Sequence, residues 1–450
     1  MKKNSCSCPY DFPRAEFTKE MKKSYKILAP DIFPIHMELI RQVFLMYGYD
    51  LEILHSRGKH IIDRGLESLH NDMCYPAICM SGQQLDALVS GEYDPHKCAL
   101  IQFQTGGGCR ASNYIWLLRK ALHNMGMDYV PVISLSFSGM EKASGFKITP
   151  MMIAKGMVAV IYGDLLMLLR NQVKPYECNP GDTQRVIDHW YVELTEQFRH
   201  NRGLFGKKFR KNLRDITRDF HNIPRKDVRK IKVGIVGEIY VKYSPFGNNG
   251  LEEFLESQGC EYMVPGVLGF FQFMFDNKQT DRRLYGGHFK SAMAAKLGAA
   301  MTGKIERIFR KTLAEFPEFS APTSFEHIKQ LGDRVIGRGV KMGEGWLLPA
   351  EAAELIEKGY PNIVCAQPFG CLPNHIVGKG TVRTLRQMYP TANICPIDYD
   401  SGASKVNQEN RIKLMLAMAQ ENAEEQTAKD EKASRKTTGN VKEAPAPIPM

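Results

Sequence analysis

The chain has 450 residues, more than one ordinary hydrophobic core holds, and this length predicts two or three α/β domains. Its hydrophobic fraction of 43% and charged fraction of 24% are ordinary for a soluble globular protein and unlike those of a disordered or fibrous chain. The eleven cysteines are an odd count, and the first residues lack the pattern of a signal peptide. We therefore expect a cytoplasmic protein whose cysteines are reduced thiols or metal ligands.

The first part of the chain, residues 20–148, alternates predicted strands and helices. Strands are expected at residues 25–30, 51–54, 99–103 and 130–135. Helices are expected at 34–47, with Met37, Ile40 and Phe44 on one face, and at 113–125, capped by Ser112 or Asn113. This alternation predicts a Rossmann-like parallel sheet with right-handed crossovers.

A helical connector is predicted for residues 149–227, and Pro224 should end its last helix. The apolar stretch at 150–169 is interrupted by Lys155 and Asp164, which favours a buried helix over a membrane span. Residues 202–232 contain twelve Lys or Arg and three Asp. A solvated connector is the simpler interpretation of this basic stretch, while an acidic partner, CoA phosphates or nucleic acid are alternatives. No nucleic-acid motif accompanies it, so we do not expect nucleic-acid binding.

A second Rossmann-like region is predicted for residues 228–421, with strands at 231–237, 362–365 and 393–397. Residues 422–450 are charged and then rich in Ala and Pro, which predicts a disordered tail. The expected fold is therefore α/β, with two parallel-sheet regions joined by a helical segment.

Three cysteines in turns are the main candidates for a binding site. Cys74 lies in NDMCYP at 71–76, Cys109 in QTGGGCR at 104–110, and Cys371 in QPFGCLPNH at 367–375. The last two follow predicted strands, where open α/β sheets place their binding groups. Thiolates suit iron–sulfur clusters, and neighbouring glycines let the backbone approach. The residues alone leave buried structural cysteines as an equal alternative, because none of the three forms a Cys-x-x-Cys pair.

Several neighbouring residues compete or assist. Cys365 is the main rival of Cys371 as third ligand, although its apolar surroundings favour a core thiol. Arg110 and His375 are weak catalytic candidates: either could act beside a cluster, and either could be an ordinary structural residue. Cys6 and Cys8 could form an accessory metal site or an exposed pair without function.

The three motifs, with IDYDSGAS at 397–404, resemble the 2-hydroxyacyl-CoA dehydratase family. The resemblance covers about residues 17–418 and is closest to the C-terminal dehydratase-like region of fused activase/dehydratase proteins. It implies one 4Fe–4S cluster held by Cys74, Cys109 and Cys371, with the fourth position open to substrate or a small ligand.

The resemblance also implies an activity of the lyase class, in anaerobic metabolism. A separate ATP-dependent activase would send one electron through the cluster to the thioester carbonyl of a 2-hydroxyacyl-CoA, and water would leave from the resulting ketyl radical anion. The implied partners are that activase, the acyl-CoA and a second dehydratase-like subunit, without a membrane. This chain shows no P-loop, because GIVGE at 234–238 lacks both G-x-G-x-x-G and the P-loop lysine.

Two other functions stay open at this point. One is an iron–sulfur reductase or electron-relay component, related to double-cubane cluster proteins and acting on another substrate. The other is a non-catalytic assembly subunit.

Overall fold

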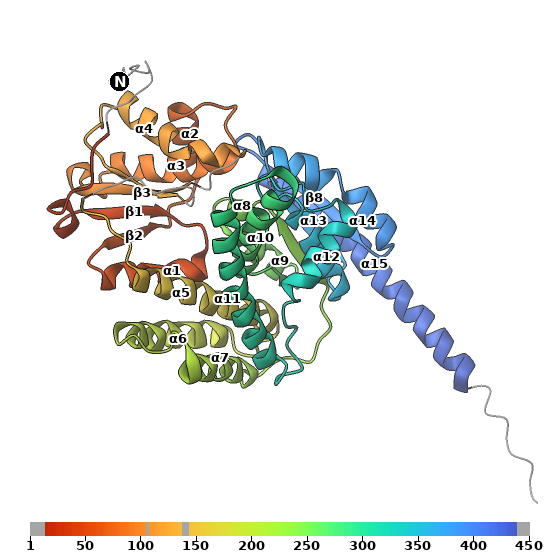
Figure 1. The fold of residues 1–450 in the computed structure, drawn as a ribbon. Helices are drawn as coiled ribbons and strands as arrows, with labels where there is room; N and C mark the ends of the chain where they lie inside the picture. The colour runs from red at the N-terminus through yellow and green to blue at the C-terminus, as the bar shows by residue number, and fades with distance from the viewer. Residues whose placement is uncertain (1–13, 105–107, 137–143, 439–450) are drawn as a thin grey trace, which may run out of the picture.

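The computed structural model describes residues 14–104, 108–136 and 144–438. It contains two four-stranded parallel sheets with helices packed around them (Figure 1). The predicted α/β class, with two parallel-sheet regions joined by a helical segment, is confirmed.

The first sheet has the strand order β2-β1-β3-β4. Its strands are β1 (Lys26–Pro30), β2 (Asp50–Leu54), β3 (Cys98–Gln104) and β4 (Val132–Ser136). All three neighbouring pairs are parallel, with Lys26 opposite both Asp50 and Cys98. From β1 the chain first adds β2 on one side and then adds β3 and β4 on the other side of the sheet. Ligand sites of doubly wound sheets lie at such a switch point, here between β1 and β3.

Helices cover both faces of this sheet. They are α1 (Pro34–Met46), α2 (Lys59–Ser68), α3 (Tyr75–Val89) and α4 (Tyr114–Asn124), with short 3-10 turns at Met21–Lys23, Pro95–Lys97 and Arg110–Asn113. Figure 1 shows α1 on one face and α2, α3 and α4 on the other. Asn113 occupies the N-cap position of α4, but its side chain makes no capping hydrogen bond among the described residues.

Three helices form the connector: α5 (Pro150–Val173), α6 (Asp182–Arg199) and α7 (Gly206–His221). Thr149 caps α5 by accepting a hydrogen bond from the Met152 amide at 3.1 Å. The segment Pro150–Tyr176 is long and apolar enough to cross a membrane, yet 78% of its most apolar window is buried inside the protein. α7 ends just before Asn222, as the following proline predicted.

The basic stretch lies on α7 and the segment that follows it. Arg214 pairs with Glu315 at 2.6 Å, Arg225 with Glu318 at 3.9 Å, and His221 also contacts Glu318. Part of the positive charge thus fastens the connector to the segment after α11, in keeping with the connector interpretation.

The second sheet repeats the first, with the order β6-β5-β7-β8 and every neighbouring pair parallel. Its strands are β5 (Lys232–Gly237), β6 (Glu261–Met263), β7 (Asn362–Pro368) and β8 (Asn393–Tyr399). Counted within each half of the chain, both sheets therefore have the order 2-1-3-4.

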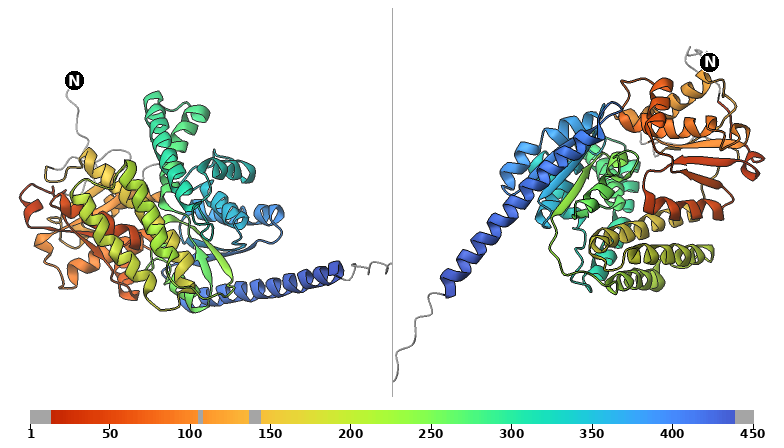
Figure 2. Two further views of the ribbon diagram at one scale, coloured as in Figure 1. Left: turned by 90° about the horizontal axis from the view of Figure 1, so that it is seen from below. Right: turned by 180° about the vertical axis from the view of Figure 1, so that it is seen from behind.

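The helices of the second half differ more from those of the first. They are α8 (Ile239–Tyr243), α9 (Leu251–Ser257), α10 (Val267–Tyr285), α11 (Phe289–Leu313), α12 (Phe325–Val335), α13 (Leu347–Glu357), α14 (Val382–Met388) and α15 (Lys405–Thr438), with a π-helical segment at Asn374–Lys379. Figure 2 shows the α10–α11 hairpin standing out from the second domain and α15 extending away from the body. The end of α15 falls within the segment predicted to be disordered, and residues 439–450 lie outside the described residues.

One buried carboxylate joins the first domain, the connector and the second domain. Asp164 on α5 lies 2.8 Å from His36 Nε2 on α1, and it accepts hydrogen bonds from the Val267 and Leu268 amides of α10 at 2.7 and 2.8 Å. Asp164 and His36 are both buried. This carboxylate satisfies first-turn amides of α10 that would otherwise lack a partner.

We expect Asp164→Ala to lower the free energy of unfolding by about 3 kcal/mol or more, because two buried amides and a histidine lose their acceptor. Urea unfolding followed by circular dichroism measures this. Glu67→Ala, which removes an exposed partner of Arg64, is the control and should change stability by less than about 1 kcal/mol. Equal effects of the two substitutions would contradict the role assigned to Asp164.

Candidate functional site

The three candidate cysteines lie where secondary-structure elements begin or end. Cys109 follows β3 and precedes the 3-10 turn Arg110–Asn113, and Cys371 follows β7. Cys74 is the N-cap residue of α3, whose first turn contains Pro76. Cys109 and Cys371 therefore lie beyond the carboxyl ends of β3 and β7, as their sequence positions predicted.

Backbone contacts bring the three loops together. The Tyr75 amide donates a hydrogen bond to the Phe369 carbonyl at 3.0 Å. Arg110 donates to the Asp72 carbonyl, and its guanidinium also lies against Gly370. The structure thus places the loops of Cys74, Cys109 and Cys371 around one point between the domains.

Polar groups contact two of the sulfurs. Cys74 Sγ lies 2.9 Å from the Tyr114 hydroxyl, and Asn374 Nδ2 donates to Cys371 Sγ at 3.2 Å. Cys74 and Cys371 are buried, whereas Cys109 is partly exposed. Hydrogen bonds to sulfur and restricted solvent access are the means by which proteins tune iron–sulfur clusters.

All three thiols are poor acids in the metal-free chain. Burial raises the pKa of Cys74 and Cys371, and it raises the pKa of Cys109 to about 11. A thiol that stays protonated at neutral pH is a weak nucleophile. Any metal that binds to these thiols must therefore displace protons.

Two carboxyl groups that sequence reasoning missed face the same site. Glu238 follows β5 and accepts a hydrogen bond from the Val241 amide at 2.9 Å, and Glu344 accepts one from the Ile239 amide at 2.9 Å. The charge of each contributes to the raised pKa values of Cys109 and Cys371. Glu238 was visible in the sequence only as the residue after a predicted strand, and Glu344 lies in a loop without any motif.

The pKa of both carboxyls is raised. Loss of hydration raises the pKa of Glu238 to about 8, with a further contribution from the charge of Glu344. Burial likewise raises the pKa of Glu344, which is 6% exposed.

Cys365 lies inside β7 rather than in a loop. Its sulfur accepts a hydrogen bond from Gln367 Nε2 at 3.5 Å, and burial raises its pKa to about 12. The charges that act on it are those of Asp398, Lys379 and Cys395, whereas Glu238 and Glu344 act on Cys371. The surroundings of Cys365 therefore resemble those of a core thiol.

The other candidates are placed as follows. His375 is half-buried in the π-helical segment, and its side chain makes no hydrogen bond or ion pair with the described residues. Arg110 is exposed and holds two loops together, which is a structural role. Cys6, Cys8, Gly106 and Gly107 lie outside the described residues.

The donors at this site are thiols. Within the described ranges, no three Cys, His, Asp or Glu side chains are grouped as a single metal ion requires. Iron–sulfur clusters take cysteine thiolates as ligands, and the three loops bring thiols from distant parts of the chain toward one point.

Comparison with known proteins gives no independent guide, since no family model, curated protein or solved structure matches the chain.

The raised pKa of Glu238 predicts a pH-dependent stability. Between the unfolded value of 4.5 and the folded value of about 8, the folded state binds more protons than the unfolded state. The contribution is fully present below pH 4.5 and is lost as the pH rises through 8. We expect Glu238→Gln to remove a slope of up to about 1.4 kcal/mol per pH unit.

Urea unfolding of the metal-free chain at pH 5, 7 and 8.5 measures this slope. Glu67→Gln changes an exposed carboxyl and should keep the wild-type slope. An unchanged slope in Glu238→Gln would show that the folded protein leaves this carboxyl ionised at neutral pH.

Gly370 supplies a second test, because its φ of 72° disfavours any side chain and a Cβ would lie 3.1 Å from Cys74 Cα. Gly286 has the same φ of 72°, with no described atom within 4 Å of its would-be Cβ. Both substitutions to Ala should cost about 1–2 kcal/mol of backbone strain. Only Gly370→Ala should also speed the reaction of the buried Cys74 and Cys371 thiols with a thiol reagent, because it separates their loops. Equal labelling rates in the two variants would contradict this close approach.

Proposed function

We propose that the protein is an iron–sulfur subunit that eliminates water from a 2-hydroxyacyl-CoA after a separate ATP-dependent activase supplies one electron. The observation that carries the proposal is the convergence of three thiol-bearing loops, tied together by Tyr75, Phe369 and Arg110. The resemblance of the same three motifs to the dehydratase family supplies the chemistry.

Cys74, Cys109 and Cys371 would hold the cluster. When bound, a 4Fe–4S cluster with an open iron supplies one-electron transfer and Lewis acidity. Tyr114 and Asn374 contact two of the ligand sulfurs and orient them.

Glu238 is the group that we assign to proton transfer. Its raised pKa keeps a proton on the carboxyl at neutral pH, close to the thiols. That proton can pass to the departing hydroxyl group, so that water leaves, and the resulting carboxylate can accept the proton lost from the β-carbon. The two transfers restore the original carboxyl group.

The proposed electron transfer needs a protein partner, because the sequence shows no P-loop that would drive it with ATP. Large apolar side chains are exposed beside Cys371: Met342 (51%), Phe369 (45%), Leu372 (57%) and Ile376 (64%). Clustered exposed apolar groups are typical of protein contact surfaces. Their position beside the cysteine loops supports delivery of the electron from this side.

Anaerobic purification with iron and sulfide analysis and EPR tests the cofactor. We expect about four irons per chain in the wild type and loss of most of the iron in Cys109→Ser, because one of only three protein ligands is removed. Cys395→Ser is the control, since Cys395 is also a partly buried thiol but lies within β8. Full iron in Cys109→Ser would exclude Cys109 as a ligand, and an iron-free wild type would favour the assembly-subunit function.

Activity is tested with 2-hydroxyacyl-CoA, ATP, a reductant and an activase, by following the enoyl-CoA. We expect turnover in the wild type and in Cys395→Ser and none in Cys109→Ser. An iron-loaded wild type that reduces other acceptors without forming enoyl-CoA would favour the electron-relay function instead.

A further inference from the structure

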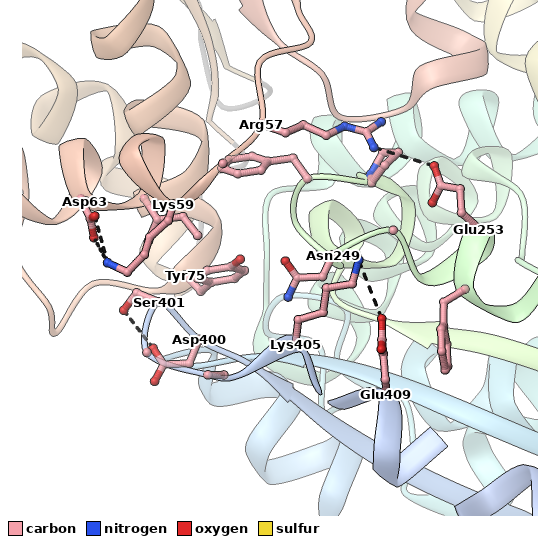
Figure 3. A pocket seen from close by; sticks show the side chains of 18 of the residues that line it. Arg57, Lys59, Asp63, Tyr75, Asn249, Glu253, Asp400, Ser401, Lys405 and Glu409 are labelled. Carbon is pink, nitrogen blue, oxygen red and sulfur yellow. Dashed lines mark hydrogen bonds and ion pairs between the residues drawn. The ribbon is translucent and has the colours of Figure 1, made fainter. Parts of the chain in front are cut away.

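A cavity with a volume of about 990 cubic ångströms lies between the two domains, and Figure 3 shows the side chains around it. The first domain contributes Arg57, Lys59, Asp63 and Tyr75, and the second contributes Asn249, Glu253, Asp400, Lys405 and Glu409. Arg57 follows β2 and Asp400 follows β8, so the cavity lies at carboxyl ends of strands in both sheets. Domain interfaces and strand ends of this kind are common ligand sites, and this volume is at the upper end of their range.

Three cationic side chains line the cavity, those of Arg57, Lys59 and Lys405. Arg57 and Lys405 form only long ion pairs. Arg57 lies 3.8 Å from Glu253 and Lys405 lies 3.8 Å from Glu409, both beyond hydrogen-bonding distance. The side chains of Arg57 and Lys405 are more than half exposed, and exposed pairs of this kind contribute little to stability. Both cations can therefore turn to a phosphate group at small cost and form stronger charge-assisted hydrogen bonds with it.

Asp400 differs from the other carboxylates of the cavity. Asp63, Glu253 and Glu409 each face a cation, whereas Asp400 has no basic partner among the described residues and accepts only the Ser401 hydroxyl, at 3.1 Å. A carboxylate at a strand end with free acceptor capacity suits a vicinal diol, as in the ribose sites of dinucleotide-binding folds.

The remaining lining is apolar or backbone. Ile62, Leu66, Phe246 and Phe254 provide surface for a flat base. α2 and α15 both begin at the cavity, at Lys59 and Lys405, so the partial positive charge of two helix N-termini adds to that of the side chains. The side chains of the lining carry three positive and four negative charges, so phosphate binding depends on the helix N-termini as well as on the cations.

We propose that this cavity binds a nucleoside phosphate, with its phosphates on Arg57 and Lys405, its ribose on Asp400 and its base against the apolar side chains. A free nucleotide such as ADP has all three parts, whereas the ribose of CoA carries a 3′-phosphate and therefore lacks the vicinal diol. The inference is therefore independent of the proposed function. Tyr75 lines the cavity and directly follows Cys74, so the cavity adjoins the cysteine site.

Isothermal titration calorimetry of the metal-free full chain with ADP and with CoA tests the inference. We expect ADP to bind with a Kd below about 1 mM and at least as tightly as CoA, and Arg57→Ala and Lys405→Ala each to weaken ADP binding about tenfold. Asp400→Asn should weaken nucleotide binding but leave the binding of inorganic pyrophosphate unchanged. Lys211→Ala is the matched control, because Lys211 also pairs with a carboxylate four residues later but lies on α7, away from the cavity.

The results separate this inference from the proposed function. ADP binding at least as tight as CoA binding supports the inference, whereas CoA binding without ADP binding overturns it. Failure of ADP to bind, or wild-type affinity for ADP in both cation variants, also overturns the inference even if the chain takes up iron. Nucleotide binding by a chain that takes up no iron retains the inference and rejects the proposed function.

Discussion

The arrangement of the two domains depends on the carboxylate of Asp164. Its hydrogen bonds to His36 and to the first turn of α10 hold α1, α5 and α10 together in the interior. Glycines make this approach possible, because a Cβ on Gly163 would overlap His36 and one on Gly266 would lie 2.8 Å from Asp164. In this relative orientation the loops of the three cysteines meet, and the cavity forms between strand ends of the two sheets.

The two sheets share one strand order and use corresponding positions for their polar groups. In each half, an acidic residue follows the strand that comes first along the chain: Asp31 follows β1 and Glu238 follows β5. A cysteine follows the strand that comes third along the chain: Cys109 follows β3 and Cys371 follows β7. The two halves thus place the same residue types at corresponding strand ends. They differ in their crossovers, since the chain between β6 and β7 contains the α10–α11 hairpin, α12 and α13.

The sequence predicted the strands well because buried parallel strands are short apolar runs bounded by turn residues. It also placed Cys109 and Cys371 at strand ends, which follows directly from chain order. It did not reveal β6, which has three residues, or the helices of the long crossover, whose apolar positions pack against several different partners. Glu344 reaches the neighbourhood of Glu238 through a hydrogen bond from the Ile239 amide, 105 residues away in sequence. No local sequence pattern encodes such a contact. The sequence could not show that Cys365 lies inside a strand and Cys371 in a loop, because this depends on β7 ending between them at Pro368.

The raised pKa values of the three thiols bear on how the metal-free chain responds to air. Burial raises the pKa of each of them, and two have hydrogen-bonding neighbours among the described residues. Any metal that binds to them must therefore displace their protons. Because thiols oxidise less readily than thiolates, the metal-free chain should resist air oxidation at these three positions.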